Sequence, residues 1–444
     1  MGSNTVLSDD RNLEKSLPPG LTRSVFFLSI VFLIGASAGF LMILNRAGII
    51  SVGELHYKRL VALHGFNQMI VFVNLFMFYV NERIFDRFGL PSYRSHLADR
   101  MILLGWIICQ SVLIFQKDSF ISSRYLLLST NWGFYLGTCF VLMGFFVLLV
   151  GQTRQIGLGR LFASNFLVYS AGMTLMILIL CHGLGLISFF GLFISEFHEI
   201  GISRQMIWIG SGHLPIQALT VSVLSGFILL MKVEPTSHSR LEQVLKSALW
   251  LYFFFALISA LTSFSELFSL PLSLFPYWAE GPYLAVFATG LIGASIISSL
   301  IRDQKSSAQI KFGLWGLIFL FFIMGGLTGV ALLVPEWRGK MMGNFHMTGH
   351  FHPLVAGGTL ISLYLLWSQE VTLKKWLSWM LICGGIVGIG LFSFAMHVLG
   401  EMGILRRDFL NLKLSLSLSL LTLGGGLTLT VGLLMVSLIM RRKK

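Results

Sequence analysis

The chain has 444 residues, of which 55% are hydrophobic and only 11% are charged, with a mean hydropathy of +0.81. Soluble domains carry about twice that charged fraction, so this composition excludes an ordinary water-soluble globular protein. The formal net charge of +13 does not indicate nucleic-acid binding, because basic loops on the cytoplasmic side of a membrane protein give the same excess.

Apolar runs of about 20 residues, each long enough to cross a bilayer as a helix, recur along the chain. We therefore predict an all-α polytopic membrane protein with twelve transmembrane helices. They lie near residues 24–44, 60–80, 99–116, 126–150, 161–186, 204–231, 245–266, 283–301, 312–334, 345–368, 376–399 and 415–440. Residues 1–22 are predicted to be a flexible tail, residues 23–440 the membrane domain, and residues 441–444 a basic end.

Lysine and arginine predict how the helices are oriented, because basic residues are enriched in cytoplasmic loops. If the spans alternate in direction, most basic loops fall on one side, together with the C-terminal run Arg441–Lys444. We predict that this side is the cytoplasm, so that both termini are cytoplasmic in an inner membrane of the bacterial type. Arg406 and Arg407 fall on the opposite, outer side and need a separate explanation.

Four histidines lie within predicted spans, at similar depth from the outer side: His64, His213, His350 and His352. One such histidine is most simply explained by a hydrogen bond to a backbone carbonyl. Ionisable groups inside a membrane are costly, however, and four in one layer on three helices indicate a functional site. Three further histidines (His182, His346 and His397) are nearer the span ends and are expected at the membrane interface.

His350 and His352 are two residues apart, which places them about 200° apart around an α-helix. They therefore point to opposite sides of the tenth span and cannot ligate one metal together. Neutral imidazole is a good ligand for haem iron. One flank could pair with His64 to give a six-coordinate haem, and the other could hold a five-coordinate haem with an open position.

Three segments resemble motifs of the catalytic subunit I of the haem–copper oxidase superfamily. ALHGFNQM around His64 resembles the family's helix II motif, and GHFHPLV around His350 resembles the helix X motif. HVLGEMGILRRDF, residues 397–409, resembles the loop between helices XI and XII. The resemblance covers essentially the whole chain and implies the twelve-helix fold of that subunit.

The resemblance also implies a role for each matching residue. His64 and His352 would ligate a low-spin haem, and His350 would be the proximal ligand of a high-spin haem. His213 would be the helix VI ligand of a second metal. Arg406 and Arg407 would bind haem propionates, for which charge-assisted hydrogen bonds are well suited.

The sequence departs from the family pattern around the second metal. The adjacent histidine pair of helix VII is absent, and Ser263–Phe264–Ser265 stands in its place. Pro215 and Gln217 replace the glutamate and tyrosine that follow the helix VI histidine in many oxidases. In this family the copper site needs three imidazoles, so the resemblance implies that stoichiometric copper is not bound. Glu266 and His213 could instead hold a harder metal such as non-haem iron, although a glutamate that meets water at the end of its helix is the simpler explanation for Glu266.

The resemblance implies a membrane oxidoreductase that reduces O2 or NO at the high-spin haem. Electrons would come from a quinol or a cytochrome, directly or through an electron-donor subunit. The alternative is a haem-bearing relative without copper that transfers electrons or binds a gas but is not a pumping oxidase. A transporter whose histidines bind substrate is a third hypothesis, which leaves the HxH and Arg406–Arg407 combination unexplained.

Overall fold

The computed structural model describes residues 19–115, 120–122, 127–163, 165–195, 213–231, 239–267, 281–303, 306–331, 334–341, 343–369, 373–404 and 416–441. The predicted tail therefore lies largely outside the described residues, as do Arg406 and Arg407. The first helix begins at Pro19, within the range predicted as tail. Proline is favoured in the first turn of a helix, where its missing N–H is not needed.

The described residues are almost entirely helical. The helices are α1 (Pro19–Arg46), α2 (Glu54–Gly65), α3 (Val73–Arg87), α4 (His96–Phe115), α5 (Trp132–Ile156), α6 (Leu158–Ala163), α7 (Phe166–Ser195), α8 (His213–Leu230), α9 (Ser239–Leu267), α10 (Gly281–Arg302), α11 (Ala308–Ile318), α12 (Thr328–Ala331), α13 (Pro335–Met341), α14 (Phe345–His352), α15 (Gly358–Ser368), α16 (Lys375–Glu401) and α17 (Leu416–Arg441). Three π-helical segments, η2 (Phe66–Phe72), η5 (Phe319–Leu327) and η6 (Pro353–Gly357), join α2 to α3, α11 to α12 and α14 to α15.

Over most of its described residues, each predicted span coincides with a helix or with one of these joined runs. Within the described ranges, nine helices are long and apolar enough to cross a bilayer, and two shorter apolar helices cover Pro215–Leu230 and Phe287–Arg302. The prediction of an α-helical membrane fold is confirmed. The count of twelve crossings stays a prediction.

A small hairpin was not predicted. Strands β1 (Phe120–Ser122) and β2 (Leu127–Ser129) pair antiparallel, with Ile121 opposite Leu128. The predicted start of the fourth span at residue 126 is therefore wrong, since α5 begins at Trp132. Asn131 caps this helix, because its side-chain oxygen accepts a hydrogen bond from the Gly133 N–H at 2.8 Å.

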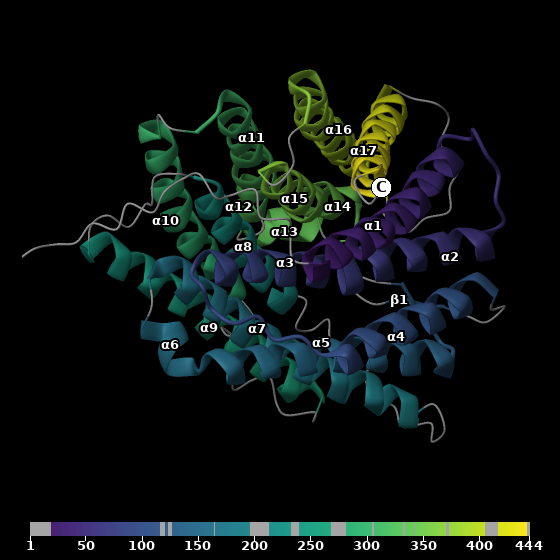
Figure 1. Cartoon of the computed structure of the whole chain (residues 1–444). Helices are drawn as coiled ribbons and strands as arrows, with labels where there is room; N and C mark the ends of the chain where they lie inside the picture. Colours follow the sequence, from purple (N-terminus) through teal and green to yellow (C-terminus); the bar gives the residue numbers. More distant parts are fainter. Residues whose placement is uncertain are drawn as a thin grey trace, which may run out of the picture.

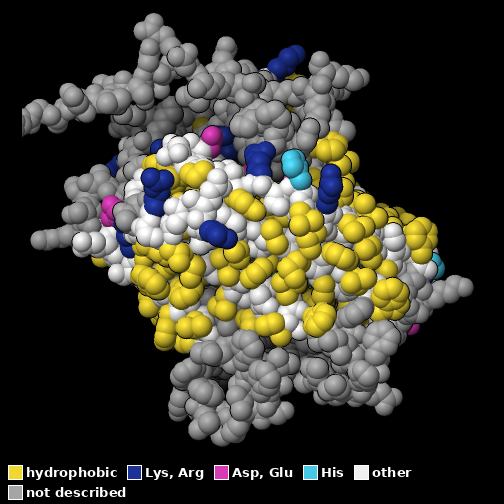
Figure 2. All heavy atoms as spheres, turned by 60° about the horizontal axis from the view of Figure 1, so that its bottom comes forward, with side chains coloured by type: hydrophobic (Ala, Val, Ile, Leu, Met, Phe, Trp, Pro, Cys, Tyr) yellow, Lys and Arg dark blue, Asp and Glu magenta, His cyan; other side chains and the backbone are white. Residues whose placement is uncertain are grey.

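The run from α14 to α15 lies near the middle of the bundle (Figure 1). It packs against α16, α8 and α11, while α1 packs against α2 and α17. Hydrophobic side chains spread over much of the face in Figure 2, and lysine and arginine gather toward one edge. Exposed apolar residues such as Phe115, Ile301 and Leu416 fit a surface that meets lipid.

The π-helical segment η6 has a cause in the sequence. Pro353 has no N–H to donate to the Gly349 carbonyl four residues earlier, so the α-helical pattern ends there. The Ser393 hydroxyl of α16 donates to that carbonyl instead. The break directly follows His352, so the histidine pair sits at the end of α14, which is tied to α16. Single-turn π segments are frequent at functional sites.

The α16–α17 pair is held at close range by glycines. A Cβ at Gly424 would lie 2.6 Å from the Gly388 carbonyl oxygen and 2.6 Å from the Phe392 backbone nitrogen. Small residues allow such backbone approach between membrane helices. The glycine-rich stretch of α17 is therefore explained by packing.

We expect Gly424→Ala to lower the free energy of unfolding by about 1–3 kcal/mol, because the new methyl meets backbone atoms that cannot turn away. Thermal unfolding in detergent measures this. Gly426→Ala is the matched control, since a Cβ there would lie 3.6 Å from ring atoms of Phe40, an ordinary contact distance. Equal melting temperatures for the two variants would contradict the packing interpretation.

Candidate functional site

His64 lies on α2, one residue before the helix ends and just ahead of η2. Its Nδ1 is 2.8 Å from the Gly35 carbonyl oxygen of α1. A carbonyl only accepts hydrogen bonds, so Nδ1 carries the proton and Nε2 carries the lone pair. A Cβ at Gly39, one turn further along α1, would lie 2.7 Å from His64 Nδ1. Gly39 thus leaves room for the imidazole beside α1, and the Gly35 carbonyl fixes the orientation of the ring.

His352 is the last residue of α14, and its Nδ1 is 2.8 Å from the Thr348 carbonyl oxygen. By the same reasoning Nδ1 is the donor and Nε2 carries the lone pair. The rings of His64 and His352 are 6.1 Å apart between centroids, with only 5° between their planes. The Phe392 ring packs edge-on against His352 at 4.7 Å. Two imidazoles of one tautomer are therefore held parallel.

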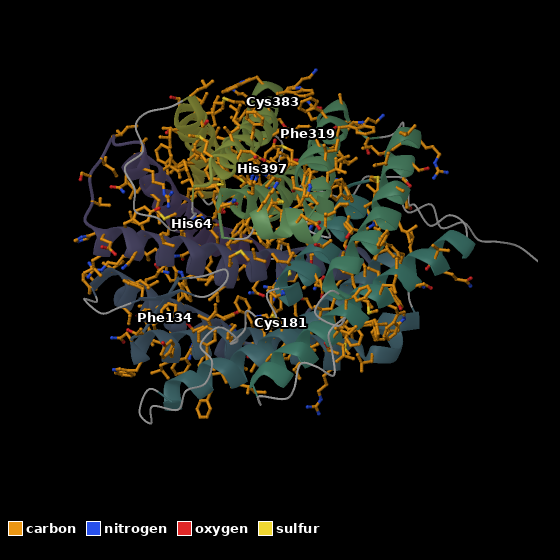
Figure 3. The ribbon with its side chains drawn as sticks, turned by 180° about the vertical axis from the view of Figure 1, so that it is seen from behind. His64, Phe134, Cys181, Phe319, Cys383 and His397 are labelled. Atoms are coloured by element: carbon orange, nitrogen blue, oxygen red, sulfur yellow. The ribbon has the colours of Figure 1, made fainter. Side chains whose placement is uncertain are left out.

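A cavity of about 260 Å³ reaches both histidines. Side chains of α1, α2, α14, α16 and α17 line it, and most of them are apolar, including Phe40, Phe351 and Leu421. Figure 3 shows His64 on its helix within this part of the bundle. Among the polar lining residues are Gln68, whose side chain donates to the Phe32 carbonyl, and the pair Arg46–Tyr57.

Arg46 brings a buried positive charge to this cavity. It is only 3% exposed, and its Nε donates to the Tyr57 hydroxyl at 2.5 Å. Its guanidinium also lies over the Phe345 ring, 4.7 Å from the centroid. Buried arginine is rare unless it is paired, and here the Tyr57 hydroxyl and the Phe345 ring hold the charge at one wall of the cavity.

His350 faces the other flank of α14, toward α12. Its Nδ1 is 2.9 Å from Thr328 Oγ1. The Thr328 hydroxyl lies 2.7 Å from the Met324 carbonyl oxygen and 2.8 Å from that of Gly325, so it donates there and accepts from His350. His350 therefore has the same tautomer as His64 and His352. Gly329 leaves room for the ring, since a Cβ there would lie 2.9 Å from His350 Cε1.

For the other predicted site residues the structure describes no side-chain position. His213 is the first residue of α8, and Glu266 is near the end of α9, but both side chains lie outside the described part of the structure, as do Arg406 and Arg407 altogether. Within the described residues, no group of three or more histidine, cysteine, aspartate or glutamate side chains is arranged to hold a metal ion.

His182, which the sequence places near the outer end of its span, lies in the packed interior of the bundle. It is fully buried on α7, with Nδ1 2.8 Å from the Leu178 carbonyl oxygen and the ring packed edge-on against Phe145. One ring nitrogen of His182 is therefore hydrogen-bonded to a carbonyl of its own helix. That geometry is typical of a histidine held in the core.

Sequence reasoning missed the residues that orient the imidazoles. Thr328 is one of several threonines in apolar runs, and nothing in the sequence distinguishes it. Gly35 and Gly39 offered a weak signal, because small residues four apart form a face for close helix packing.

No family model matches the chain. Segments of it are similar to cytochrome c oxidase subunit 1 of Alkalihalophilus pseudofirmus, with 30% identity over 98 residues, and of Candida albicans, with 28% identity over 141 residues. These segments cover 20% and 30% of this chain, and 15% and 26% of the two relatives. The chain thus matches only a minor part of each relative's length.

The similarity of the whole fold extends further than these segments. A structure described as a heme-copper terminal oxidase dimer superposes with a TM-score of 0.71. The match covers 94% of this chain and 82% of that one, at 17% sequence identity. The chain is therefore an integral membrane protein with the fold of subunit I of the haem–copper oxidases.

Proposed function

We propose that this haem–copper oxidase subunit I-like chain binds two haems, one on each flank of α14, and reduces O2 or NO with electrons from a quinol or a cytochrome. The second candidate function is electron transfer or gas binding without rapid turnover. The absence of the adjacent histidine pair in the Ser263–Ser265 region favours it.

The parallel pair His64–His352 carries this proposal. Metal–imidazole bonds are about 2.0 Å long, and a ring centroid lies about 1.1 Å behind its nitrogen, so two imidazoles on opposite sides of one iron have centroids about 6.3 Å apart. The separation in this structure is 6.1 Å. Both rings keep Nε2 available by donating Nδ1–H to a carbonyl, as metal-bound histidines usually do.

The surroundings of this pair fit a large, flat and mostly apolar group. The cavity walls are apolar, and Gly39 removes the side chain that would collide with His64. The haem would supply a one-electron redox centre. Arg46 and Tyr57 would bind a polar substituent at one wall. Arg406 and Arg407 are proposed to bind the propionates.

His350 would be the proximal ligand of the second haem. Thr328 holds the imidazole in the tautomer that keeps Nε2 available, and its bonds to two carbonyls of η5 fix the hydroxyl itself. An outer-shell partner of this kind orients a ligand and raises its basicity. The face opposite His350 would stay open to a small gas. His213 and Glu266 are proposed as ligands if a second metal such as non-haem iron is bound.

The proposed location is an inner membrane of the bacterial type, with both termini in the cytoplasm. The unequal distribution of basic residues between alternate loops supports this orientation. The proposed partners are an electron-donor subunit or a soluble cytochrome, the lipid bilayer and the gaseous substrate.

Haem and metal analysis of the purified chain tests the proposal. We expect two haems per chain and clearly less than one copper, because the Ser263–Ser265 region offers no imidazole. One reduced haem should bind carbon monoxide. The absence of haem would refute the proposed function, and one copper per chain with fast oxygen uptake would show that other residues complete a copper site.

A further inference from the structure

Three titratable side chains outside the proposed haem ligands form a connected chain. His346 Nε2 lies 3.1 Å from Glu401 Oε1, and His346 Nδ1 lies 3.1 Å from His397 Nδ1. His346 belongs to the first turn of α14, and the other two belong to the last turns of α16. Figure 3 shows His397 on a different helix from His64 in the same half of the molecule.

The backbone fixes these three groups at one end of the bundle. The Phe345 N–H donates to the Ile404 carbonyl at 3.2 Å, and the Asn344 side chain donates to the Gly400 carbonyl at 3.4 Å. A Cβ at Gly400 would lie 2.5 Å from the His346 backbone nitrogen. The glycine thus lets the end of α16 lie directly on the start of α14.

The hydrogen-bonded series Glu401–His346–His397 leads from water to the neighbourhood of His350. The Glu401 side chain is 81% exposed, whereas that of His346 is 12% exposed. His397 Nε2 is buried and has no hydrogen-bond partner among the described residues. A Cβ at Gly349 would lie 3.1 Å from that nitrogen, so it rests against the residue that precedes His350.

The two bonds fix the tautomers. The Glu401 carboxylate accepts from His346 Nε2–H, which leaves His346 Nδ1 as an acceptor in the neutral ring. His397 Nδ1 then carries the proton and donates to His346. The lone pair of His397 falls on the buried Nε2. The hydrogen-bonded series therefore has a proton acceptor, His397 Nε2, at its inner end and a solvated carboxylate, Glu401, at its outer end.

We propose that Glu401, His346 and His397 form a proton relay between the aqueous surface and the site beside His350. The proposal rests on the proposed function, since reduction of a buried haem adds a negative charge that a proton would compensate. Among the described residues, two other charged side chains on the packed elements are Arg46, stacked on Phe345, and Lys340 of α13, whose backbone carbonyl accepts from Asn344.

The proton balance is explicit. A proton that reaches His397 Nε2 sends the Nδ1 proton of His397 to His346, and the Nε2 proton of His346 to Glu401, which releases it to water. Both rings are then in the opposite tautomer, with no net change in charge. From that tautomer His397 would pass its Nε2 proton inward to a carboxylate of the bound haem, and the same transfers in reverse would reload the relay with one proton from water. The tautomer of the structure is then the one that follows proton uptake. One proton can thus enter when the haem is reduced and leave when it is oxidised.

The arrangement does not favour a metal site. The carboxylate lies on Nε2 of His346, while the imidazole of His397 lies on Nδ1, so the three groups do not converge on one point. A hydrogen-bonded chain uses both nitrogens of the central ring. This is the geometry that proton transfer through an imidazole requires.

The test follows proton exchange with the medium after flash reduction of the haem-loaded, full-length protein by a photochemical one-electron donor, with a pH-sensitive dye. Glu401→Gln and His397→Phe should slow proton exchange by about 100-fold, as expected when a positioned acid–base group is removed. Glu401→Asp should retain most of the rate. Glu54→Gln is the matched control, because Glu54 is an exposed carboxylate paired with Lys58 on α2.

The haem spectrum separates the possible outcomes. Slow proton exchange with an unchanged spectrum in Glu401→Gln, and a normal rate in Glu54→Gln, would support the relay. Proton exchange at the parental rate in both Glu401→Gln and a spectrally intact His397→Phe would overturn the relay and leave the proposed function standing. A parent protein without haem would refute the proposed function, and the relay with it.

Discussion

Replacing either His64 or His352 with alanine should abolish the six-coordinate, low-spin haem spectrum. The two rings are parallel and 6.1 Å apart, so in the proposed site each would supply one of the two ligands that a six-coordinate haem iron needs from the protein. No other described histidine lines the cavity. The five-coordinate haem on His350 should remain in both variants, because His350 faces the opposite flank of α14. Optical spectra of the reduced protein, with and without carbon monoxide, measure both haems in one sample.

The carbon monoxide spectrum is also the control for folding in these variants, since a misfolded chain would lose both haems. His56→Ala provides a further control, because His56 is an exposed histidine of α2 outside the cavity. A low-spin spectrum that survived in either His64→Ala or His352→Ala would show that the iron has a different axial ligand.

Replacing Thr328 with valine should weaken binding of the second haem by about 10- to 100-fold, the usual cost of losing the outer-shell partner of a metal-bound histidine. Valine has nearly the same shape but cannot accept the hydrogen bond from His350 Nδ1, which is 2.9 Å from the threonine hydroxyl. The His350 tautomer and ring orientation are then no longer fixed. The carbon monoxide-binding haem per chain, measured by titration with haem, gives the size of the effect.

Thr328→Ser is the matched comparison, because it keeps the hydroxyl and removes only a methyl group. Its haem affinity should stay within a few-fold of the parent. If valine and serine gave the same affinity, Thr328 would be a packing residue and His350 would be oriented in another way.

The positions of the histidines on their helices could be predicted from the sequence, because they depend only on the hydropathy and spacing of nearby residues. Length and hydropathy predict helices in a bilayer, and the 3.6-residue period places His350 and His352 on opposite flanks whatever surrounds them. The position of His64 opposite His352 followed from depth and from the resemblance, and the structure brings these two rings together.

The bonds that orient each ring could not be predicted. Two of the three acceptors are backbone carbonyls of Gly35 and Thr348, and every residue has a carbonyl. The third acceptor, Thr328, lies 22 residues from its histidine and just after a π-helical segment whose register the hydropathy pattern does not show. The contact between His346 and His397 likewise depends on how closely α16 approaches α14 at Gly400, which is a tertiary property.

Electron paramagnetic resonance of the oxidised, purified protein tests the central claim most directly, because the low-spin signal reports both the axial ligands and the angle between their planes. With 5° between the rings of His64 and His352, the protein should give the rhombic signal of two nearly parallel imidazoles, alongside a high-spin signal from the second haem. A low-spin signal typical of perpendicular planes or of a single imidazole ligand would contradict the assignment of these two histidines, and so would the absence of any low-spin signal.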